Sequence, residues 1–490
     1  MTIERVINKF KENHPEEDTT VIQLAYELAE KAHEGQLRKT GVPYIQHPLY
    51  TAYTLAEIKT DAATVAAGLL HDVPEDTDHD LEEIRILFGN EIAMLVEGVT
   101  KLGKIKYRGI ERYRENLKKM FLAMASDLRI IFIKFCDRLN NLRTIEALPP
   151  EKQKRIAQET MEIYAPIAGM LGISRLKWQM EDICFKILYP EEFHDLEYRY
   201  EVEKKVERNR FFHKVKKIIA PRLDEAGIKH TIEVRFKHLY SIYQKMQRKD
   251  RRFDEIYDVF ALRIIVPTID DCYKTLGVIH TLWKPKSNRF KDYIAVPKPN
   301  GYRSLHTTII GPENKATKFQ IRTWEMHEES TYGLAAHWHY KTQDSSDYKQ
   351  PSWLQEIIEI QKEVTNTSEF VKKIKLDIFR DRIFVFSPNG DVFELPEGST
   401  PIDFAYAVHT DIGNKAVGVL INDNLGKLDQ VLKNGDFIEI IMEKNRPYPN
   451  KDWLKFVKTK RARDRIKQFA KKSTLENIKR FIPGIKKKAN

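Results

Sequence analysis

Two histidines and two aspartates in the first third of the sequence could share a metal ion. They are His47, in an HP pair; His71 and Asp72, adjacent in LLHDVPEDT; and Asp137, in KFCDRLNNLRT. Two imidazoles and two carboxylates suit a divalent ion such as Mn2+ or Fe2+, whereas a structural zinc usually recruits thiolates. Such an ion binds phosphate oxygens and makes hydroxide from water at neutral pH. A lone histidine is usually a satisfied core or surface residue, but the joint pattern predicts the metal site of a phosphohydrolase.

Three charged residues near this set are candidates for catalytic roles. Arg38 lies nine residues before the first histidine in RKTGVPYIQHP, where a guanidinium could reach a phosphate held by the metal. Glu75 and Asp76 follow the HD pair, and Pro74 disfavours continuation of the preceding helix. We therefore expect both acids just past the helix end, where they orient a water or act as general acid or base.

A second cluster of basic and aromatic residues lies between positions 235 and 306. A helix in RFKHLYSIYQKM would place Ser241 and Lys245 on one face as contacts for several phosphates. YDVFALRII offers Asp258 as a Mg2+ ligand, and RFKDYIAVPKPNGYRSLHT alternates cations with aromatic faces that stack on a purine. The alternative is a ligand-free surface loop, because no glycine-rich Walker loop is present. The candidate nucleotide-binding residues are Arg235, Lys237, Ser241, Lys245, Arg263, Lys291, Tyr293, Lys298, Asn300, Tyr302 and His306.

The elements that must position these residues change in type along the chain. Apolar residues recur at three-to-four spacing through roughly the first 190 residues, which predicts an all-α bundle. Strand-like runs such as ALRIIVP then alternate with helical ones, which predicts an α+β domain with a mixed sheet. PNG and KNGDFIEII turns predict a small β-rich module farther on. The expected domains are 1–195, a helical phosphohydrolase domain; 196–341, an α+β nucleotidyltransferase-like domain; 342–376, a linker and helix; 377–445, the β-rich module; and 446–490, a basic helical tail.

Composition predicts a soluble, multidomain protein of the cytoplasm. At 490 residues and 57.6 kDa the chain exceeds the size at which single hydrophobic cores stop growing. The sequence has no run of about 18 apolar residues, and its N-terminus lacks the apolar stretch of a signal peptide. Its three cysteines are too scattered for a CxxC metal site or a disulfide framework. The net charge of +11 does not by itself indicate a nucleic-acid binder, because 82 basic residues are offset by 71 acidic ones.

Five segments of the first domain carry a family resemblance. They are RKTGVPYIQHP, LLHDVPEDT, GVTKLGKI, DRLNNLRT and ETMEIYAPIAGMLGISRLKW. The chain here resembles the HD-type phosphohydrolases, and specifically the long RelA/SpoT-homologue family, which makes and degrades the alarmones guanosine tetra- and pentaphosphate. The resemblance implies that the metal is Mn2+, held by His47, His71, Asp72 and Asp137, and that Glu75 and Asp76 aid the attack of water.

The same resemblance implies a pocket for the guanosine nucleotide. Its lining residues would be Arg38, Lys39, Asn141 and Thr144. The chain departs from the family at Asn140, where DRLHNMRT has a histidine, and at Pro74, which replaces an aliphatic residue. Neither departure removes a metal ligand.

The basic and aromatic segments, with QIRTWEMHEESTYGLAAHWHYK, are similar to the synthetase domain of that family. That domain moves pyrophosphate from ATP to the 3′-hydroxyl of GTP or GDP. The resemblance implies that Tyr302 stacks on guanine, that Asp258 binds Mg2+, and that the basic residues grip the phosphates of both nucleotides. It also brings Gln320 and Arg322 into the site. The RFKD run, Arg289 to Asp292, resembles the charge signature of bifunctional members.

One departure from the synthetase pattern concerns Lys318. The family usually reads E-x-Q-I-R-T, in which the glutamate assists magnesium and activates the 3′-hydroxyl, whereas this chain reads KFQIRT. A lysine cannot bind Mg2+, and at its usual pKa it is a poor base at pH 7. Because strand side chains alternate, Gln320 and Arg322 share a face with residue 318. We therefore expect weak or lost synthesis; a register shift that brings Glu313 nearer is the alternative.

Two segments near the C-terminus, PIDFAYAVHTDIGNKAVGVLIN and LKNGDFIEII, resemble the TGS domain, named for threonyl-tRNA synthetase, GTPases and SpoT. In the family this module is regulatory, and in ribosome-bound members it meets tRNA. The resemblance makes His409 a candidate for RNA contact, with a hydrogen-bonded turn histidine as the alternative. Through this module and the basic tail KTKRARDRIKQFAKK, the ribosome and tRNA are candidate partners.

The predicted function is a Mn2+-dependent 3′-pyrophosphohydrolase that removes pyrophosphate from ppGpp and pppGpp. Its synthetase domain, which would use Mg2+, is expected to be weakened by Lys318. One alternative is a fully bifunctional enzyme that also acts on ATP with GTP or GDP. Another is a non-catalytic stress sensor that binds the ribosome or tRNA. An ATP-dependent transfer assay separates the first two, and metal analysis with a hydrolysis assay separates the third.

Overall fold

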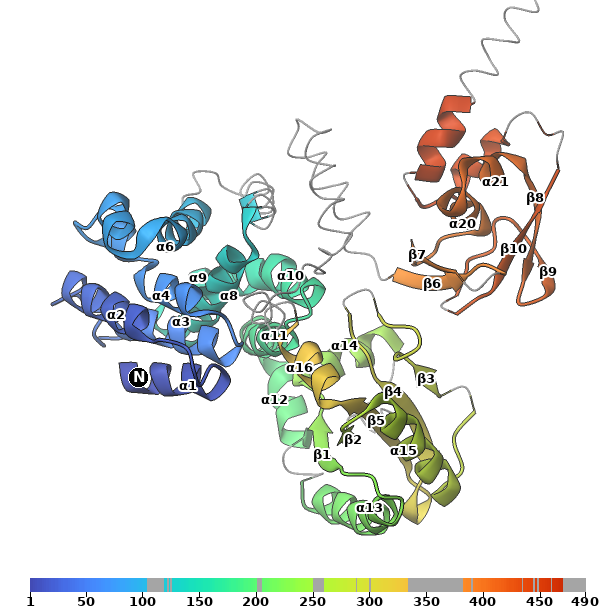
Figure 1. Cartoon of the computed structure of the whole chain (residues 1–490), viewed down its shortest axis with the longest axis horizontal. Coiled ribbons are helices and arrows are strands. Elements are labelled where there is room, and N and C mark those ends of the chain that lie inside the picture. Colours follow the sequence, from blue (N-terminus) through green and yellow to red (C-terminus); the bar gives the residue numbers. More distant parts are fainter. Residues whose placement is uncertain are drawn as a thin grey trace, which may run out of the picture. The chain divides into compact units, whose positions relative to one another are not determined.

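The structure, a computed structural model, divides into two compact units, Met1–Lys362 and Glu363–Asn490, which are considered one at a time (Figure 1). It describes residues 1–103, 119–120, 123, 126–200, 205–249, 260–287, 289–298, 301–333, 382–388, 391–433, 435–443, 446, 449–459 and 461–469. The predicted linker and helix at 342–376 lie outside these ranges. Within them, no helix combines the length and the apolar character that a membrane span requires.

The first domain of the first unit is built from helices, as predicted. The α-helices are α1 (Ile3–Asn13), α2 (Thr20–Ala32), α3 (Gln46–Glu57), α4 (Ala62–Leu70), α5 (Val73–Asp76), α6 (Leu81–Gly103), α8 (Leu128–Arg143), α9 (Pro150–Glu159), α10 (Ala165–Met170), α11 (Ser174–Leu188) and α12 (Pro190–Tyr198). A 3-10 turn, η1 (Ile145–Ala147), and a π turn, η2 (Thr160–Tyr164), connect some of them.

Helix α4 lies at the centre of this domain because it is apolar on every side. Its residues 64–70 are all buried, as expected for a helix without a polar face. The Asp61 carboxylate caps its N-terminus by accepting a hydrogen bond from Thr64 N at 2.7 Å. A Cβ at Gly68 would overlap Leu55 Cδ1, so this glycine allows α3 and α4 to approach closely. The packing fixes the end of α4, from which His71 projects.

The chain breaks its helix at the HD pair, as the proline predicts. Helix α4 ends at Leu70, and the separate one-turn helix α5 begins at Val73 with Pro74 in its first turn. Glu75 and Asp76 therefore lie beyond the end of α4, on α5, with exposed side chains.

The second domain of this unit is a mixed sheet with helices, as predicted. Its sheet has the order β1-β2-β5-β4-β3, in which β2 and β5 are parallel and the other pairs are antiparallel. The elements are α13 (Lys205–Glu225), β1 (Thr231–Phe236), α14 (Leu239–Lys249), β2 (Phe260–Val266), α15 (Ile269–Leu282), β3 (Lys291–Asp292), β4 (Leu305–Ile310), η5 (Pro312–Asn314), β5 (Ala316–Thr323) and α16 (Trp324–Tyr332).

The two faces of this sheet differ in chemistry because side chains alternate along each strand. One face contributes Leu262, Ile264, Phe319 and Ile321 to a core that also contains apolar residues of α13 and α15. Residues in register on the opposite face include Glu233, Arg263, Gln320 and His306. We call this second surface the polar sheet face; among the described strand residues it comprises Thr231, Glu233, Arg235, Ala261, Arg263, Ile265, Lys291, His306, Thr308, Ile310, Ala316, Lys318, Gln320 and Arg322.

The second unit contains a two-stranded sheet, β6-β7, and a three-stranded sheet, β10-β8-β9. The Asp403 carboxylate accepts hydrogen bonds from Lys458 N and Thr459 N, at 2.9 and 2.7 Å. Trp453, Val457, Ala462 and Ile466 share a core with Ile402 and Tyr406 of helix α20, so the first part of the basic tail packs on this module. The elements are β6 (Arg382–Phe386), β7 (Val392–Pro396), α20 (Pro401–Val408), α21 (Thr410–Lys415), β8 (Ala416–Ile421), β9 (Asn424–Gly426), β10 (Ile438–Met442) and η7 (Lys451–Lys455).

Candidate functional site

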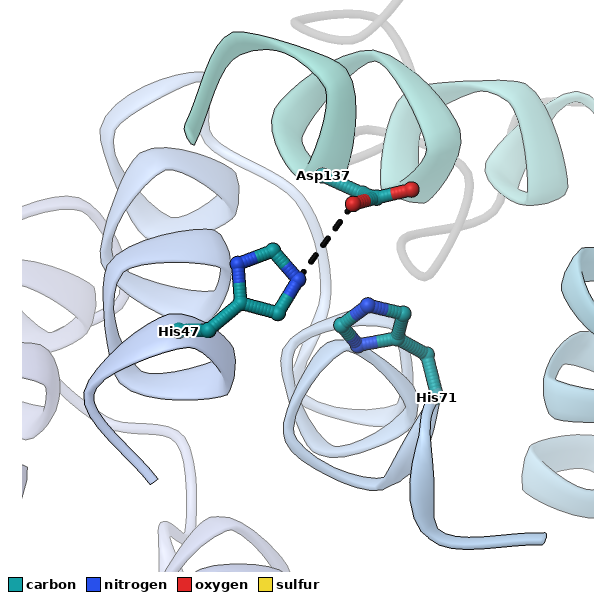
Figure 2. A group of neighbouring side chains, drawn as sticks. All are labelled: His47, His71 and Asp137. Atoms are coloured by element: carbon teal, nitrogen blue, oxygen red, sulfur yellow. Dashed lines mark ion pairs between the residues drawn. The ribbon is translucent and has the colours of Figure 1, made fainter. Parts of the chain in front are cut away.

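Three helices bring His47, His71 and Asp137 together inside the first domain. Figure 2 shows the side chains turned toward one another, from the start of α3, the end of α4 and the middle of α8. One ligand atom from each residue lies within 4.8 Å of the other two, and all three residues are buried. His47 Nε2 is 3.3 Å from Asp137 Oδ1. This convergence is the geometry that a metal ion requires.

Hydrogen bonds on the far side of each imidazole direct its Nε2 toward this centre. His71 Nδ1 lies 2.9 Å from the carbonyl oxygen of Gly68, which can only accept, so Nδ1 carries the proton. His47 Nδ1 lies 2.7 Å from Asn140 Oδ1 and donates to it. Asn140, a departure from the family pattern, thus serves as the acceptor that orients a candidate ligand.

The donor atoms fit a divalent cation. His71 Nε2 is buried and has no hydrogen-bond partner among the described residues, and burial lowers the pKa of His71, which keeps the ring neutral. Burial alone would raise the pKa of Asp137, but the Lys134 ammonium and the hydrogen bond to His47 hold it well below its usual range. The neutral His71 imidazole, the His47 imidazole and the ionised Asp137 carboxylate are the types of donor that bind a divalent metal ion.

Asp72 lies beside this group of three. Its Oδ1 is 3.2 Å from His71 Nε2 and its Oδ2 is 3.4 Å from His47 Nε2. Asp72 is not one of the three residues whose donor atoms all lie within 4.8 Å of one another. The structure therefore brings all four predicted ligands together, with Asp72 at the edge of the cluster.

Tyr44 joins two of the acids and was missed in the sequence. Its hydroxyl is 3.0 Å from Asp72 Oδ2 and 2.7 Å from Asp76 Oδ2. Burial, followed by the charge of Asp72, raises the pKa of Tyr44, so the phenol keeps its proton as a donor. Its place three residues before His47 in RKTGVPYIQHP was the available signal. The Tyr44 hydroxyl thus holds Asp76 close to the candidate metal ligands.

Two of the residues expected at the nucleotide pocket are linked by hydrogen bonds to the candidate ligand Asp137. Arg38 Nη2 donates to Asn141 Oδ1 at 2.8 Å, and Asn141 Nδ2 donates to Asp137 Oδ1 at 2.5 Å. Thr144 follows at the end of the same helix, and Lys39 is exposed in the turn after Arg38. Arg38 is therefore linked to a candidate ligand through one amide side chain. Lys134, also missed in the sequence, donates to Asp137 Oδ2 at 2.7 Å.

The second candidate site lies on the polar sheet face. Arg263 on β2 is opposite Gln320 on β5, which is opposite His306 on β4. Gln320 and Arg322 are only 1% and 2% exposed, so both are built into the domain. Lys318 shares this face and lies between Ala261 and Thr308 in register. The sequence therefore predicted correctly which side chains share the face with Lys318.

An aromatic group adjoins this face. The Tyr302 hydroxyl and His306 Nε2 are 2.7 Å apart, and the Lys298 ammonium lies 4.9 and 5.3 Å from the ring centres of Tyr293 and Tyr302. Burial and the charge of Lys318 lower the pKa of His306 to about 2, so its ring is neutral.

The remaining predicted residues of this site lie on several elements, and two of them are not described. Ser241 and Lys245 lie on α14, Lys237 precedes it, and Lys291 is exposed on β3. Asp258 and Asn300 lie outside the described residues.

The alternative in which Glu313 replaces the missing glutamate is not what the structure shows. Glu313 precedes β5 in an exposed turn, where it pairs with Lys214 at 3.1 Å. The register of β5 against β4 continues without a shift from Ala316 onward. Glu313 is therefore not on the polar sheet face.

His409 lies in the second unit, where it caps α21. Its Nδ1 accepts a hydrogen bond from Asp411 N at 3.2 Å, and its side chain is exposed. The alternative of a hydrogen-bonded turn histidine is thus observed, while RNA contact stays a prediction.

The fold and the first site define a helical metal-binding domain of the HD type, followed by a mixed-sheet domain and a small β module. Family matches cover the same three regions: the HD domain over residues 25–174, the region found in RelA / SpoT proteins over 234–345, and the TGS domain over 383–442. The chain belongs to the RelA/SpoT family.

Three relatives illustrate the range of names in this family. The chain is 46% identical to a guanosine-3′,5′-bis(diphosphate) 3′-pyrophosphohydrolase of Aquifex aeolicus, over 100% of this chain and 70% of the relative. It is 47% identical to a GTP pyrophosphokinase of Myxococcus xanthus, over 94% of this chain and 62% of the relative. It is 45% identical to the bifunctional (p)ppGpp synthase/hydrolase SpoT of Escherichia coli strain K12, over 95% of this chain and 66% of the relative. The chain thus spans between 62% and 70% of the lengths of these three proteins.

Proposed function

We propose that this chain is a Mn2+-dependent 3′-pyrophosphohydrolase that acts on ppGpp and pppGpp. The observation that carries the proposal is the buried convergence of His47, His71 and Asp137, with each imidazole oriented by a hydrogen bond on its outer nitrogen. The name of the Aquifex aeolicus relative supports the same reaction. Mn2+ is favoured over a thiolate-bound zinc because the donors are imidazole nitrogens and carboxylate oxygens.

The residues around the cluster suggest how the reaction proceeds. His47, His71, Asp72 and Asp137 would hold the ion, which when bound lowers the pKa of water and neutralises phosphate charge. Asp76, positioned by the Tyr44 hydroxyl, accepts the proton of the attacking water, and Glu75 assists from the same short helix. Both acids lie at the exposed edge of the site, where water has access.

The substrate side of the site is proposed to be cationic. Arg38 contacts the phosphates of the alarmone, and its hydrogen bond to Asn141 fixes the direction of the guanidinium. Lys39, Asn141 and Thr144 line the pocket for the guanosine part. We also propose that the protein acts in the cytoplasm, where nucleotides are abundant. His409 and the basic tail are proposed to contact the ribosome or tRNA.

We propose that the synthetase site is weak because Lys318 replaces a carboxylate. The lysine shares a sheet face with Gln320 and Arg322, so its charge acts within the site. An ammonium group neither binds Mg2+ nor takes a proton from a hydroxyl at neutral pH.

A fully bifunctional enzyme is the second candidate. The polar sheet face retains Arg263, Gln320 and Arg322, and the Escherichia coli relative is named as bifunctional. Pyrophosphate transfer from ATP to GDP at a rate comparable to hydrolysis would favour this candidate and reject the weak synthetase.

The hydrolase proposal is tested by comparing His71→Ala with His79→Ala in the full chain. His71 turns its Nε2 toward the other candidate metal ligands, whereas His79 is not one of them and pairs with Glu83 at 2.8 Å. We expect His71→Ala to lose bound Mn2+ and to slow hydrolysis of ppGpp by about 100-fold or more, because a direct ligand matters at least as much as its supporting partners. His79→Ala should keep both properties. Unchanged hydrolysis in His71→Ala would reject the proposal.

A further inference from the structure

The polar sheet face carries a marked excess of positive charge. Its described strand residues supply one carboxylate, Glu233. That carboxylate lies 3.3 Å from Arg263 Nη1, so it already has a cationic partner. The cations on the same face are Arg235, Arg263, Lys291, Lys318 and Arg322. Like charges gathered on one surface repel each other, and an anion bound among them relieves that repulsion.

Three buried polar atoms of this face lack a hydrogen-bond partner among the described residues. They are Arg263 Nε, Gln320 Oε1 and Arg322 Nε. Gln320 and Arg322 are more than nine-tenths buried. Arg263 and Gln320 are opposite each other in register, and Arg322 lies two residues farther along β5 on the same face. Leaving such atoms unsatisfied costs free energy, so their presence on one face points to a ligand. Two guanidinium donors match phosphate oxygens, and the amide oxygen matches a hydroxyl or N–H donor of a nucleoside.

The aromatic side chains beside this face favour a nucleoside ligand over an inorganic anion. Tyr293, Tyr302 and His306 form edge-on contacts with one another, with ring centres 5.1 to 6.0 Å apart. His306 is in register with Gln320, so these rings adjoin the unsatisfied atoms. Aromatic rings next to phosphate-binding cations suit a purine base.

A divalent cation does not fit the described part of this face. Mg2+ requires oxygen ligands, usually carboxylates together with phosphates. Glu233 is paired with Arg263, and Lys318 brings an ammonium where the family pattern has a glutamate. Burial and then the positive charge of Lys318 lower the pKa of His306, so the ammonium interacts with this ring. Lys318 thus adds a fixed positive charge to the face at the position where the family pattern has a carboxylate.

We propose that the polar sheet face binds a nucleoside polyphosphate without a divalent cation, with the ammonium of Lys318 taking the place of the ion. The phosphates lie among Lys318, Arg263 and Arg322, and the base lies toward Tyr302. The inference rests on one part of the proposed function, namely that Lys318 replaces a carboxylate within this site. In this chain the face acts as a binding site.

The experiment measures GTP binding to the full chain by calorimetry, once with excess EDTA and once with excess Mg2+. Three variants accompany the unmodified protein: Lys318→Glu, Lys318→Gln and Lys315→Glu. Lys315 is the charge-matched control, because it pairs with Glu313 in the exposed turn before β5. Lys318→Gln removes the charge without adding an acid, which keeps the test informative if Lys318→Glu does not fold.

The unmodified protein should bind GTP in EDTA with an affinity within about threefold of that in Mg2+. Lys318→Gln and Lys318→Glu should lose about tenfold or more in EDTA, and Mg2+ should restore binding in Lys318→Glu alone, because removal of one partner of a close charge pair is costly. Lys315→Glu should behave as the unmodified protein. Binding that requires Mg2+ in the unmodified protein overturns the inference, as does unchanged binding in both Lys318 variants.

Failure of this inference is distinguishable from failure of the proposed weakness of synthesis. Robust transfer of pyrophosphate from ATP to GDP, together with GTP binding in EDTA, would reject the weakness and support metal-free binding. Absence of transfer together with strictly Mg2+-dependent GTP binding would do the reverse.

Discussion

The hydroxyl of Tyr44 connects the candidate metal ligand Asp72 to the candidate general base Asp76. It lies within hydrogen-bond distance of both Asp72 and Asp76, which belong to the HD pair and to α5 respectively. The ring is held separately, by stacking on His33 with centres 4.5 Å apart. Positioning of the carboxylate and packing of the ring can therefore be separated experimentally.

Tyr44→Phe should retain the fold and the metal while losing rate. We expect kcat for ppGpp hydrolysis to fall about 10- to 100-fold, because groups that orient a metal site typically contribute that much. Tyr50→Phe is the control, since Tyr50 lies on the same helix as His47 and is 38% exposed. Equal kcat for the unmodified protein and Tyr44→Phe would contradict the positioning role.

Another residue with a testable environment is Asp182, in the contact between α11 and α14. Burial raises its pKa from the ordinary value of 3.8 to about 6, although its carboxylate accepts a hydrogen bond from Tyr240 N at 3.0 Å. His238 is 3.9 Å away, too far for a hydrogen bond, and burial lowers its pKa to about 3. Because the pKa of Asp182 is raised by folding, the stability that its protonation provides is complete below pH 3.8 and is lost as pH rises through about 6.

Asp182→Asn should therefore stabilise the protein at pH 8 and not at pH 4. The expected gain at pH 8 is about 1 to 2 kcal/mol, somewhat less than the full linkage value because the side chain keeps some exposure. Free energies of unfolding in urea at the two pH values provide the measurement. Asp195→Asn, at an exposed position paired with Arg199, is the control and should change little at either pH. An equal effect of Asp182→Asn at both pH values would refute the assignment.

The sequence indicated the four candidate metal ligands because their types and order are characteristic, but it did not predict their hydrogen-bond partners. Tyr44 and Lys134 contact ligands only through the tertiary fold, at 3.0 Å to Asp72 and 2.7 Å to Asp137. Asn140 was noted as a departure, and its hydrogen bond to His47 became visible only when α3 and α8 were placed side by side. Local sequence patterns indicate which side chains are candidate metal ligands, whereas the packing of the helices determines which residues orient them.

At the scale of elements, the helical character of the first domain and the mixed sheet of the second followed from periodicity. The break before Pro74 and the mixed sheet were predicted, because proline geometry and side-chain alternation are local properties. The contact of α16 with the first domain was not predicted, since it joins residues far apart in sequence. Lys59 pairs with Glu328 at 2.6 Å, and Ser174 Oγ donates to Ser330 O at 2.5 Å.

Gly333 allows this contact because it ends α16 with a positive φ of 58°. A Cβ at this position would overlap Leu171 O and Gly172 C. We expect Gly333→Ala to cost at least about 2 kcal/mol in the free energy of unfolding, from backbone strain and overlap together. Gly227→Ala is the matched control: its φ is 70°, open space surrounds it, and it should cost about 1 kcal/mol. Equal costs would show that the contact is not tight.

At the scale of the whole molecule, one chain carries two candidate sites with different sets of side chains. The first has imidazole and carboxylate donors around a common centre. The second has cations and unsatisfied donors on a sheet face where the family pattern places a carboxylate at residue 318. Both candidate sites and the departure at residue 318 could be identified in the sequence, because they depend on motifs. The sequence did not predict that Trp453, Val457, Ala462 and Ile466 share a core with the TGS module. The hydrogen bonds from the backbone of Lys458 and Thr459 to Asp403 leave no periodic pattern in the sequence.

The most direct test of the central claim is pyrophosphate release from ppGpp by the metal-stripped full chain, before and after addition of Mn2+. ATP-dependent synthesis with Mg2+ is measured on the same sample. We predict no release without metal, recovery with Mn2+, and synthesis at least about tenfold slower than hydrolysis, consistent with loss of a catalytic carboxylate. Release that persists without metal, or that Mn2+ fails to restore, would contradict the assignment of His47, His71, Asp72 and Asp137 as the metal ligands of a hydrolase.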